Sequence, residues 1–375
     1  MTGQDSILQP SLVYKIKQHQ DWVDGKTGGV RAKLTGRDLS GLDLRNLNLS
    51  GAIFFEANLS KANLSGTNLE EADFERANLT GANFRQAKLK NASLEGADLC
   101  GANFSQAELK NASFEHAHLR GTIFRGAHLI SAHLKLCRMA GADMRQANLS
   151  EADLAGAELT DAILQEANLS AADLTEAELY RADLTKACLR DAILTKAQAT
   201  KANFTMADLT RARLESAVLG QADFRSAIMV KAQLANANLT RARLEDADLT
   251  EANLFEANLS KTWMTGVTLN NATLANANLV FADLAGARLS GINAINAVFD
   301  GANLTRANLA NATLRCVELD FATMTHAVLK GSDVSGLSLE GTDVTHVDFS
   351  EALNVDRIWR LDRGSLNNGN DSPSP

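Results

Sequence analysis

The sequence predicts an all-β solenoid, in which stacked coils are built from one short repeat, and three observations predict it. An apolar residue occupies every fifth position from Leu34 to Phe349, with no insertion. The residue two positions before each of them is most often Ala. Only 5% of the 375 residues are aromatic although 45% are hydrophobic. This composition suits either a helix bundle or a narrow repeated core, and the period of five favours the repeated core.

The repeat has the form A-(D/N)-L-x-x, for example A-N-L-S-K at positions 57–61. All 64 central positions are apolar, most are Leu, and the smallest are Ala199 and Ala294. Two positions earlier, Ala is found in 50 of the 64 repeats. The residue between them is usually polar, and its expected role is to hydrogen-bond the turning backbone, as at Asp98, Asp153 and Asp173.

A period of five excludes the common regular structures. An α-helix needs an apolar residue about every 3.6 positions, and a half-buried strand needs strict alternation. A period of five closes if the chain turns a corner once per repeat. The central residue and the preceding Ala then both point inward, and the other three positions face the corner and the solvent. One repeat cannot bury its central residue alone, whereas stacked coils can.

This pattern resembles the pentapeptide-repeat family, and the resemblance covers residues 32–351. Members of that family form right-handed quadrilateral β-helices with four repeats in each coil. The resemblance therefore implies a right-handed quadrilateral β-helix of about 16 coils in this chain.

Residues 1–31 lie outside the repeat and are expected to form a short N-terminal helical cap. Pro10 favours a first helical turn, and Leu12, Ile16 and Val23 follow near helical spacing. Glycines from Gly25 onward end the pattern. Such a helix would cover the open edge of the first coil, which would otherwise expose unpaired backbone groups.

The repeat ends at Asn354, where an apolar central residue is due. Residues 352–363 contain Ile358, Trp359 and Leu361 between arginines, and they predict a C-terminal cap or a dimerisation segment. The second alternative rests on the resemblance, because some members of the family pair through their C-terminal ends. Residues 364–375 are rich in Asn, Ser and Pro, and we expect a disordered tail.

No pattern predicts catalysis or a cofactor. The sequence has no G-x-x-x-x-G-K-[ST] or G-x-G-x-x-G motif and no nucleophile elbow. His326 and His346 are four repeats apart and should lie on neighbouring coils, but a metal site normally needs three or four ligands, so we expect a surface pair without a metal. We predict that the protein is not an enzyme.

The same sequence predicts a cytoplasmic protein with no membrane insertion. No run of about 18 apolar residues occurs, and the N-terminus does not read as a secretory signal. The four cysteines, Cys100, Cys137, Cys188 and Cys316, are far apart and fit reduced thiols better than a disulfide or zinc framework.

Charged residues recur with a spacing of four repeats, which should place them in rows along single faces. The acidic row is Glu75, Glu95 and Glu115, and the basic row, half a coil away, is Arg85, Arg125 and Arg145, preceded by Arg45. One interpretation is a solvated surface with modest repulsion between like charges. The other is a docking surface for a charged partner.

Exposed aromatic residues are the second surface feature. Phe281 and Phe321 occupy the last position of repeats that lie two coils apart, and Gly301 lies between them. We expect this gap to leave a groove that could accept an apolar side chain. Tyr180 should lie further along that face, and Trp263 on a neighbouring face. Clustered surface aromatics indicate a contact site.

These features predict a non-enzymatic protein–protein interaction scaffold that presents charged and aromatic surfaces. The alternative, implied by the resemblance, is a DNA-mimicking protein that binds and protects a type II topoisomerase such as gyrase. The net charge of −8 permits this alternative, but the basic row opposes it. Direct binding of nucleic acid is not expected, because an acidic surface repels phosphate.

Overall fold

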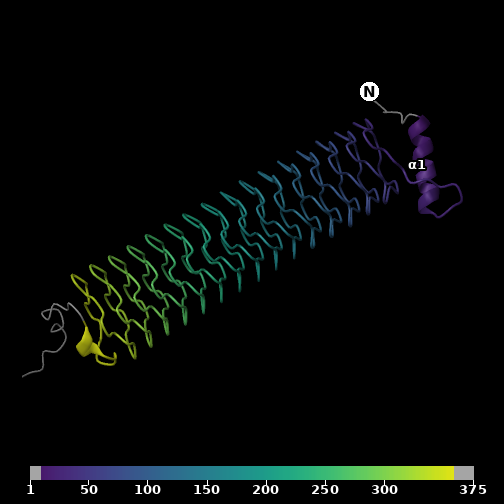
Figure 1. Ribbon diagram of the computed structural model, residues 1–375. Helices are drawn as coiled ribbons and strands as arrows, with labels where there is room; N and C mark the ends of the chain where they lie inside the picture. The colour runs from purple at the N-terminus through teal and green to yellow at the C-terminus, as the bar shows by residue number, and fades with distance from the viewer. Residues whose placement is uncertain (1–9, 359–375) are drawn as a thin grey trace, which may run out of the picture. The chain divides into compact units, whose positions relative to one another are not determined.

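The computed structural model of the protein describes residues 10–358 (Figure 1). The chain divides into two compact units, of which the first ends at Cys188 and the second begins at Leu189. The only helices in the described residues are α1, Pro10–Val23, and a single 3₁₀ turn, η1, Val355–Arg357. Between them the chain alternates tight turns with single residues in parallel β-bridges. No helix within residues 10–358 is long and apolar enough to cross a membrane.

The bridges fix the length of one coil. In the first unit each bridge joins positions that lie four repeats apart, from Lys33 with Ile53 onward. The second unit has the same parallel register, up to Asp333 with Leu353. Four repeats therefore complete one coil in both units, which confirms the four-sided β-helix predicted from the sequence.

Backbone hydrogen bonds hold neighbouring coils together on every side. The N–H of Leu239 donates to the carbonyl oxygen of Asn258 at 2.8 Å, and the N–H of Asn258 donates back to Ala237 at 2.9 Å. Within the turn, the N–H of Ala242 donates to Leu239 at 2.8 Å. Each repeat thus satisfies its backbone partly within its own turn and partly through the adjacent coil, as buried backbone groups require.

The polar position before the central residue has the structural role expected from the sequence. The side-chain Oδ1 of Asp98, Asp153 and Asp173 each accepts the backbone N–H two residues later, at 3.1, 3.0 and 2.9 Å. These short side chains stabilise the corner of the coil.

The last residue of each repeat has a left-handed backbone, which the sequence did not predict. Every such residue from Gly36 to His346 has a positive φ, between 52° and 71°. Many of them are not glycine, for example Lys231 with φ 60° and Arg241 with φ 58°. Left-handed backbone is uncommon for such residues, so the regular coil imposes it against their local preference.

The central residues form the core of both units. Every central residue from Leu34 to Leu339 is at most 3% exposed. Val344 and Phe349, the last two, are only half-buried, because no further coil covers them at this end. Phenylalanines on consecutive coils stack, as Phe54 and Phe74 do at 4.6 Å between ring centroids.

The predicted N-terminal helix is present as α1, which lies beside the first coils (Figure 1). Its buried residues are Leu12 and His19. The imidazole Nδ1 of His19 accepts the N–H of Ala32 at 3.0 Å, and the N–H of Val30 donates to Gln18 at 3.0 Å. Burial lowers the pKa of His19, and the charge of Arg31 lowers it further. A neutral imidazole therefore joins the helix to the first repeat.

Asn354 lies at the C-terminal end of the repeat, immediately before η1. This residue is exposed and left-handed, and its side-chain Nδ2 donates to Asp333 at 2.8 Å. The N–H of Gly336 donates to the carbonyl of Arg357 at 2.9 Å, so that η1 packs against the last coil. The predicted cap or dimerisation segment lies outside the described residues from Trp359 onward, and so does the predicted tail, residues 364–375.

The substitution Leu239→Asp tests the inward position of a central residue. It replaces a fully buried side chain with a carboxylate that has no partner, and we expect a loss of folding free energy of about 5 kcal/mol or more. The matched control Asn238→Asp adds the same charge at an exposed neighbouring position. Thermal unfolding followed by circular dichroism should separate the two variants, and equal melting temperatures would contradict the register.

Candidate interaction surfaces

Phe281 and Phe321 are the most exposed large apolar side chains of the second unit, at 62% and 69% exposure. Both occupy the left-handed last position of a repeat, with φ of 58° and 60°. A Cβ atom added to Gly301 would lie 2.5 Å from the ring of Phe281, and one added to Gly341 would lie 2.7 Å from the ring of Phe321. The Cδ1–Cε1 edge of each ring therefore lies against the glycine of the next coil.

The groove expected between the two phenylalanines is not present in that form. The ring of Phe281 occupies the space above Gly301 that was expected to be empty. Phe281, Gly301, Phe321 and Gly341 alternate, one on each successive coil, and we call this row the Phe edge. A larger residue at either glycine would displace the ring beside it, because the Cβ contact is too close.

A carboxylate precedes three of the four residues of the Phe edge, namely Asp300, Asp320 and Glu340, whereas Val280 precedes Phe281. The backbone N–H of Asp320 donates to Oδ1 of Asp300 at 3.0 Å, and the N–H of Glu340 donates to Oδ1 of Asp320 at 2.9 Å. Burial raises the pKa of Asp300, and the nearby charge of Asp320 raises it further. This row was missed in the sequence, although its spacing of four repeats was available as a signal.

The other predicted aromatics do not join the Phe edge. Trp263 belongs to the same unit and is 48% exposed, but its bridges to Arg243 and Asp283 place it on an adjoining side of the coil. Tyr180 belongs to the first unit. Its ring lies beneath the guanidinium of Arg181, at 5.0 Å from the centroid.

The predicted basic row is largely neutralised by its own neighbours. Nε of Arg125 and Nη2 of Arg145 approach Oδ2 of the same carboxylate, Asp143, at 2.5 and 2.7 Å. Burial alone would raise the pKa of Asp143, but hydrogen bonds from Arg145 and Arg125 outweigh it and hold the pKa at about 2. Arg45 pairs with Asp43 at 2.6 Å. Arg85, by its position, belongs to the same row as these arginines.

The acidic row lies on the opposite side of the first unit, as its offset of half a coil requires. Glu75 lies 3.6 Å from Arg76, and Glu95 accepts the hydroxyl of Ser113 at 2.9 Å. Glu115 follows one coil later. Glu75 and Glu95 therefore also have partners on the protein's own surface. Because most arginines of the basic row are paired as well, neither row forms a surface of one sign.

The predicted histidine pair is present on neighbouring coils. The rings of His326 and His346 stack with centroids 4.6 Å apart and an interplanar angle of 14°. Within residues 10–358 no group of three or more His, Cys, Asp or Glu side chains could hold a metal ion. The four cysteines are free thiols.

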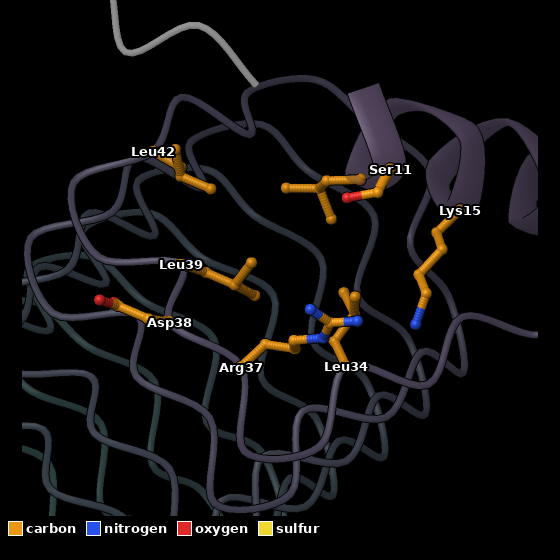
Figure 2. A pocket seen from close by; sticks show the side chains of 8 residues that line it. Ser11, Lys15, Leu34, Arg37, Asp38, Leu39 and Leu42 are labelled. Atoms are coloured by element: carbon orange, nitrogen blue, oxygen red, sulfur yellow. The ribbon is translucent and has the colours of Figure 1, made fainter. Parts of the chain in front are cut away.

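A hollow lies at the N-terminal end, between α1 and the first coil (Figure 2). Ser11 and Lys15 of α1 face Leu34 and Arg37 of the coil across it, and Leu39 and Leu42 line its far side. The helix covers only part of the open end of the first coil. The hollow is the part of that end that the helix leaves uncovered. Its lining contains no grouping of nucleophile, base and acid.

A family model described as pentapeptide repeats matches most of the chain. The matched segments are residues 32–70, 67–106, 107–146, 137–176, 177–215, 217–254, 252–291, 277–317 and 295–331. No curated protein sequence matches the chain significantly.

Several solved structures are similar to the chain in parts of their repeats. A pentapeptide repeat protein from the Arabidopsis thaliana thylakoid lumen is 30% identical over 30% of this chain and 68% of its own, with a TM-score of 0.22. HetL of the cyanobacterium Nostoc sp. strain PCC 7120 is involved in heterocyst differentiation regulation. It is 25% identical over 85% of this chain and 94% of its own, with a TM-score of 0.19. QnrB1, a plasmid-mediated fluoroquinolone resistance protein, is 18% identical over 64% of this chain and 89% of its own, with a TM-score of 0.25.

The pairing of two arginines with Asp143 makes a prediction about pH. Because the folded pKa of about 2 lies below the ordinary value of 3.8, the charged carboxylate stabilises the fold above that ordinary value, and the effect is lost as the pH falls towards 2. Asp143→Asn should remove about 2 kcal/mol of this stabilisation at neutral pH. The difference in unfolding free energy from wild type should shrink between pH 4 and about pH 2, and a difference that stays constant over that range would refute the assignment.

Proposed function

The chain belongs to the pentapeptide-repeat family, whose members fold as right-handed quadrilateral β-helices, and on that premise we propose that it is a non-enzymatic protein–protein interaction scaffold. The repeat leaves few positions for chemistry. Two of the five positions are buried, and the polar residue between them hydrogen-bonds the turn. The last two positions of each repeat present side chains to a partner, and so does the middle position where it is neither Asp nor Asn, as at Trp263.

The Phe edge is the observation that carries this proposal. Phe281 and Phe321 do not contribute to the core, and more than half of each side chain is exposed. Aromatic residues are enriched where proteins bind one another, because they supply a large contact area with few rotatable bonds. Two such rings, each held against a glycine of the next coil, offer a partner a pre-ordered apolar surface, which reduces the entropy lost on binding.

The alternative of a DNA-mimicking protector of gyrase ranks second. QnrB1, to which part of this chain is similar, is a fluoroquinolone resistance protein. A mimic of DNA would need a dense surface of one sign, whereas Arg45, Arg125 and Arg145 interrupt the acidic character of the first unit. Continuous repeats from residue 32 to 351 also leave no inserted loop for contacts with an enzyme. Cytoplasmic location remains a prediction from the sequence.

The double substitution Phe281→Ser and Phe321→Ser tests the scaffold. We expect unchanged circular dichroism, because neither ring is in the core, and the loss of captured partners or of self-association. Affinity capture with the full chain, read by mass spectrometry, and sedimentation velocity measure the two outcomes. Phe255→Ser is the matched control, since Phe255 is 36% exposed and lies outside the Phe edge. If the double variant keeps every partner and its oligomeric state, the Phe edge is not the binding surface.

A further inference from the structure

We propose that the Phe edge binds a cationic segment of a partner protein, with Arg or Lys side chains lying over the rings of Phe281 and Phe321. The carboxylates of Asp300 and Asp320 would lie beside the bound cations. This inference rests on the proposed function, because it names the class of partner for the same surface. A protein whose exposed segment carries regularly spaced Arg or Lys residues fits it.

Two aromatic rings of this chain lie beneath a guanidinium group. The guanidinium of Arg181 lies over the ring of Tyr180 at 5.0 Å, and that of Arg76 lies over Phe55 at 5.9 Å. Both are within the distance at which a cation is attracted to the face of an aromatic ring. In the described part of the chain, no such cation lies over either ring of the Phe edge. The place that an arginine occupies elsewhere on this protein is therefore open here.

The charge beside the rings also favours a cation. Oδ1 of Asp320 accepts hydrogen bonds from the hydroxyl of Ser338 at 2.6 Å and from the N–H of Glu340 at 2.9 Å, and both bonds fix the carboxylate in place. Within residues 10–358, no Lys or Arg forms an ion pair with Asp300 or Asp320. Two like charges thus lie on neighbouring coils without a countercharge, and such an arrangement is relieved when a cation binds between them.

The spacing of the coils limits the form of the partner segment. Neighbouring coils lie about 4.8 Å apart, so the two phenylalanines, two coils apart, are separated by about 10 Å. A segment in the polyproline II conformation advances about 3.1 Å per residue with three residues per turn, so every third side chain returns to the same face after about 9 Å. A segment with Arg or Lys at every third position can place one cation over each ring.

An anionic partner is disfavoured by the same carboxylates. A second copy of this chain would have to offer its own cations to the Phe edge, and it would be detected as self-association that depends on Phe281 and Phe321. That result would identify the occupant as another copy, and it would contradict the proposal of a separate partner segment.

The test uses the full chain and a labelled twelve-residue probe peptide with Arg at every third position and Ser elsewhere. Fluorescence anisotropy should show saturable binding to the wild type and binding about ten-fold weaker to Phe281→Ser/Phe321→Ser. Asp300→Asn/Asp320→Asn keeps the Oδ1 acceptors of both turns, and it should weaken binding several-fold and reduce its dependence on salt. The control Asp153→Asn/Asp173→Asn removes two charges from the first unit and should bind as wild type does.

Two further peptides complete the design. A probe with Glu in place of Arg should not bind, and a probe of the same composition with its four arginines in one block should bind more weakly than the spaced probe. Equal binding of the spaced probe to wild type and to both edge variants would overturn the proposal. If the spaced probe does not bind at all while the phenylalanine variant still loses its captured partners, the scaffold stands and the cationic specificity is wrong.

Discussion

The structure depends on one constraint, which is that every repeat must be covered by the equivalent repeat of the next coil. The N–H of a central residue such as Leu239 finds its acceptor only on that coil, and its side chain is enclosed only when the coil is in place. No repeat is stable alone, and each depends on its neighbours. The half-buried Val344 and Phe349 show the consequence at an end where this cover stops.

The same constraint decides where function can lie. The two inward positions are reserved for packing, and Asp or Asn at the middle position serves the turn, so that partner recognition relies mainly on the last two positions of the repeat. The last position has a left-handed backbone and directs its side chain over the next coil, as the contact between Phe281 and Gly301 shows. A surface built in this way consists of rows with one residue on each coil. The residue at the same position of the next coil decides whether a side chain can lie against that coil, as Phe281 lies against Gly301, or must project into the solvent.

The fold could be predicted from the sequence because its signal is repeated at every fifth residue, and each repetition supports the others. The surface could not be predicted to the same extent, because its contacts depend on the reach of individual side chains. The spacing placed Arg125 and Arg145 in one row, but it did not show that both reach Asp143 and lose much of their free charge there. It also did not reveal His19, because a single polar residue in α1 carries no periodic signal.

Deletion of one whole coil tests the central constraint most directly. Removing residues 221–240 takes out one complete coil of the second unit and brings two equivalent coils together in the original register. We expect a folded protein with an unchanged β-type circular dichroism spectrum and a single thermal transition. Removing residues 221–239 instead leaves the chain one residue out of register, and it should lower the melting temperature well below that of the first variant or split the transition in two. Equal melting curves for the two deletions would contradict the account.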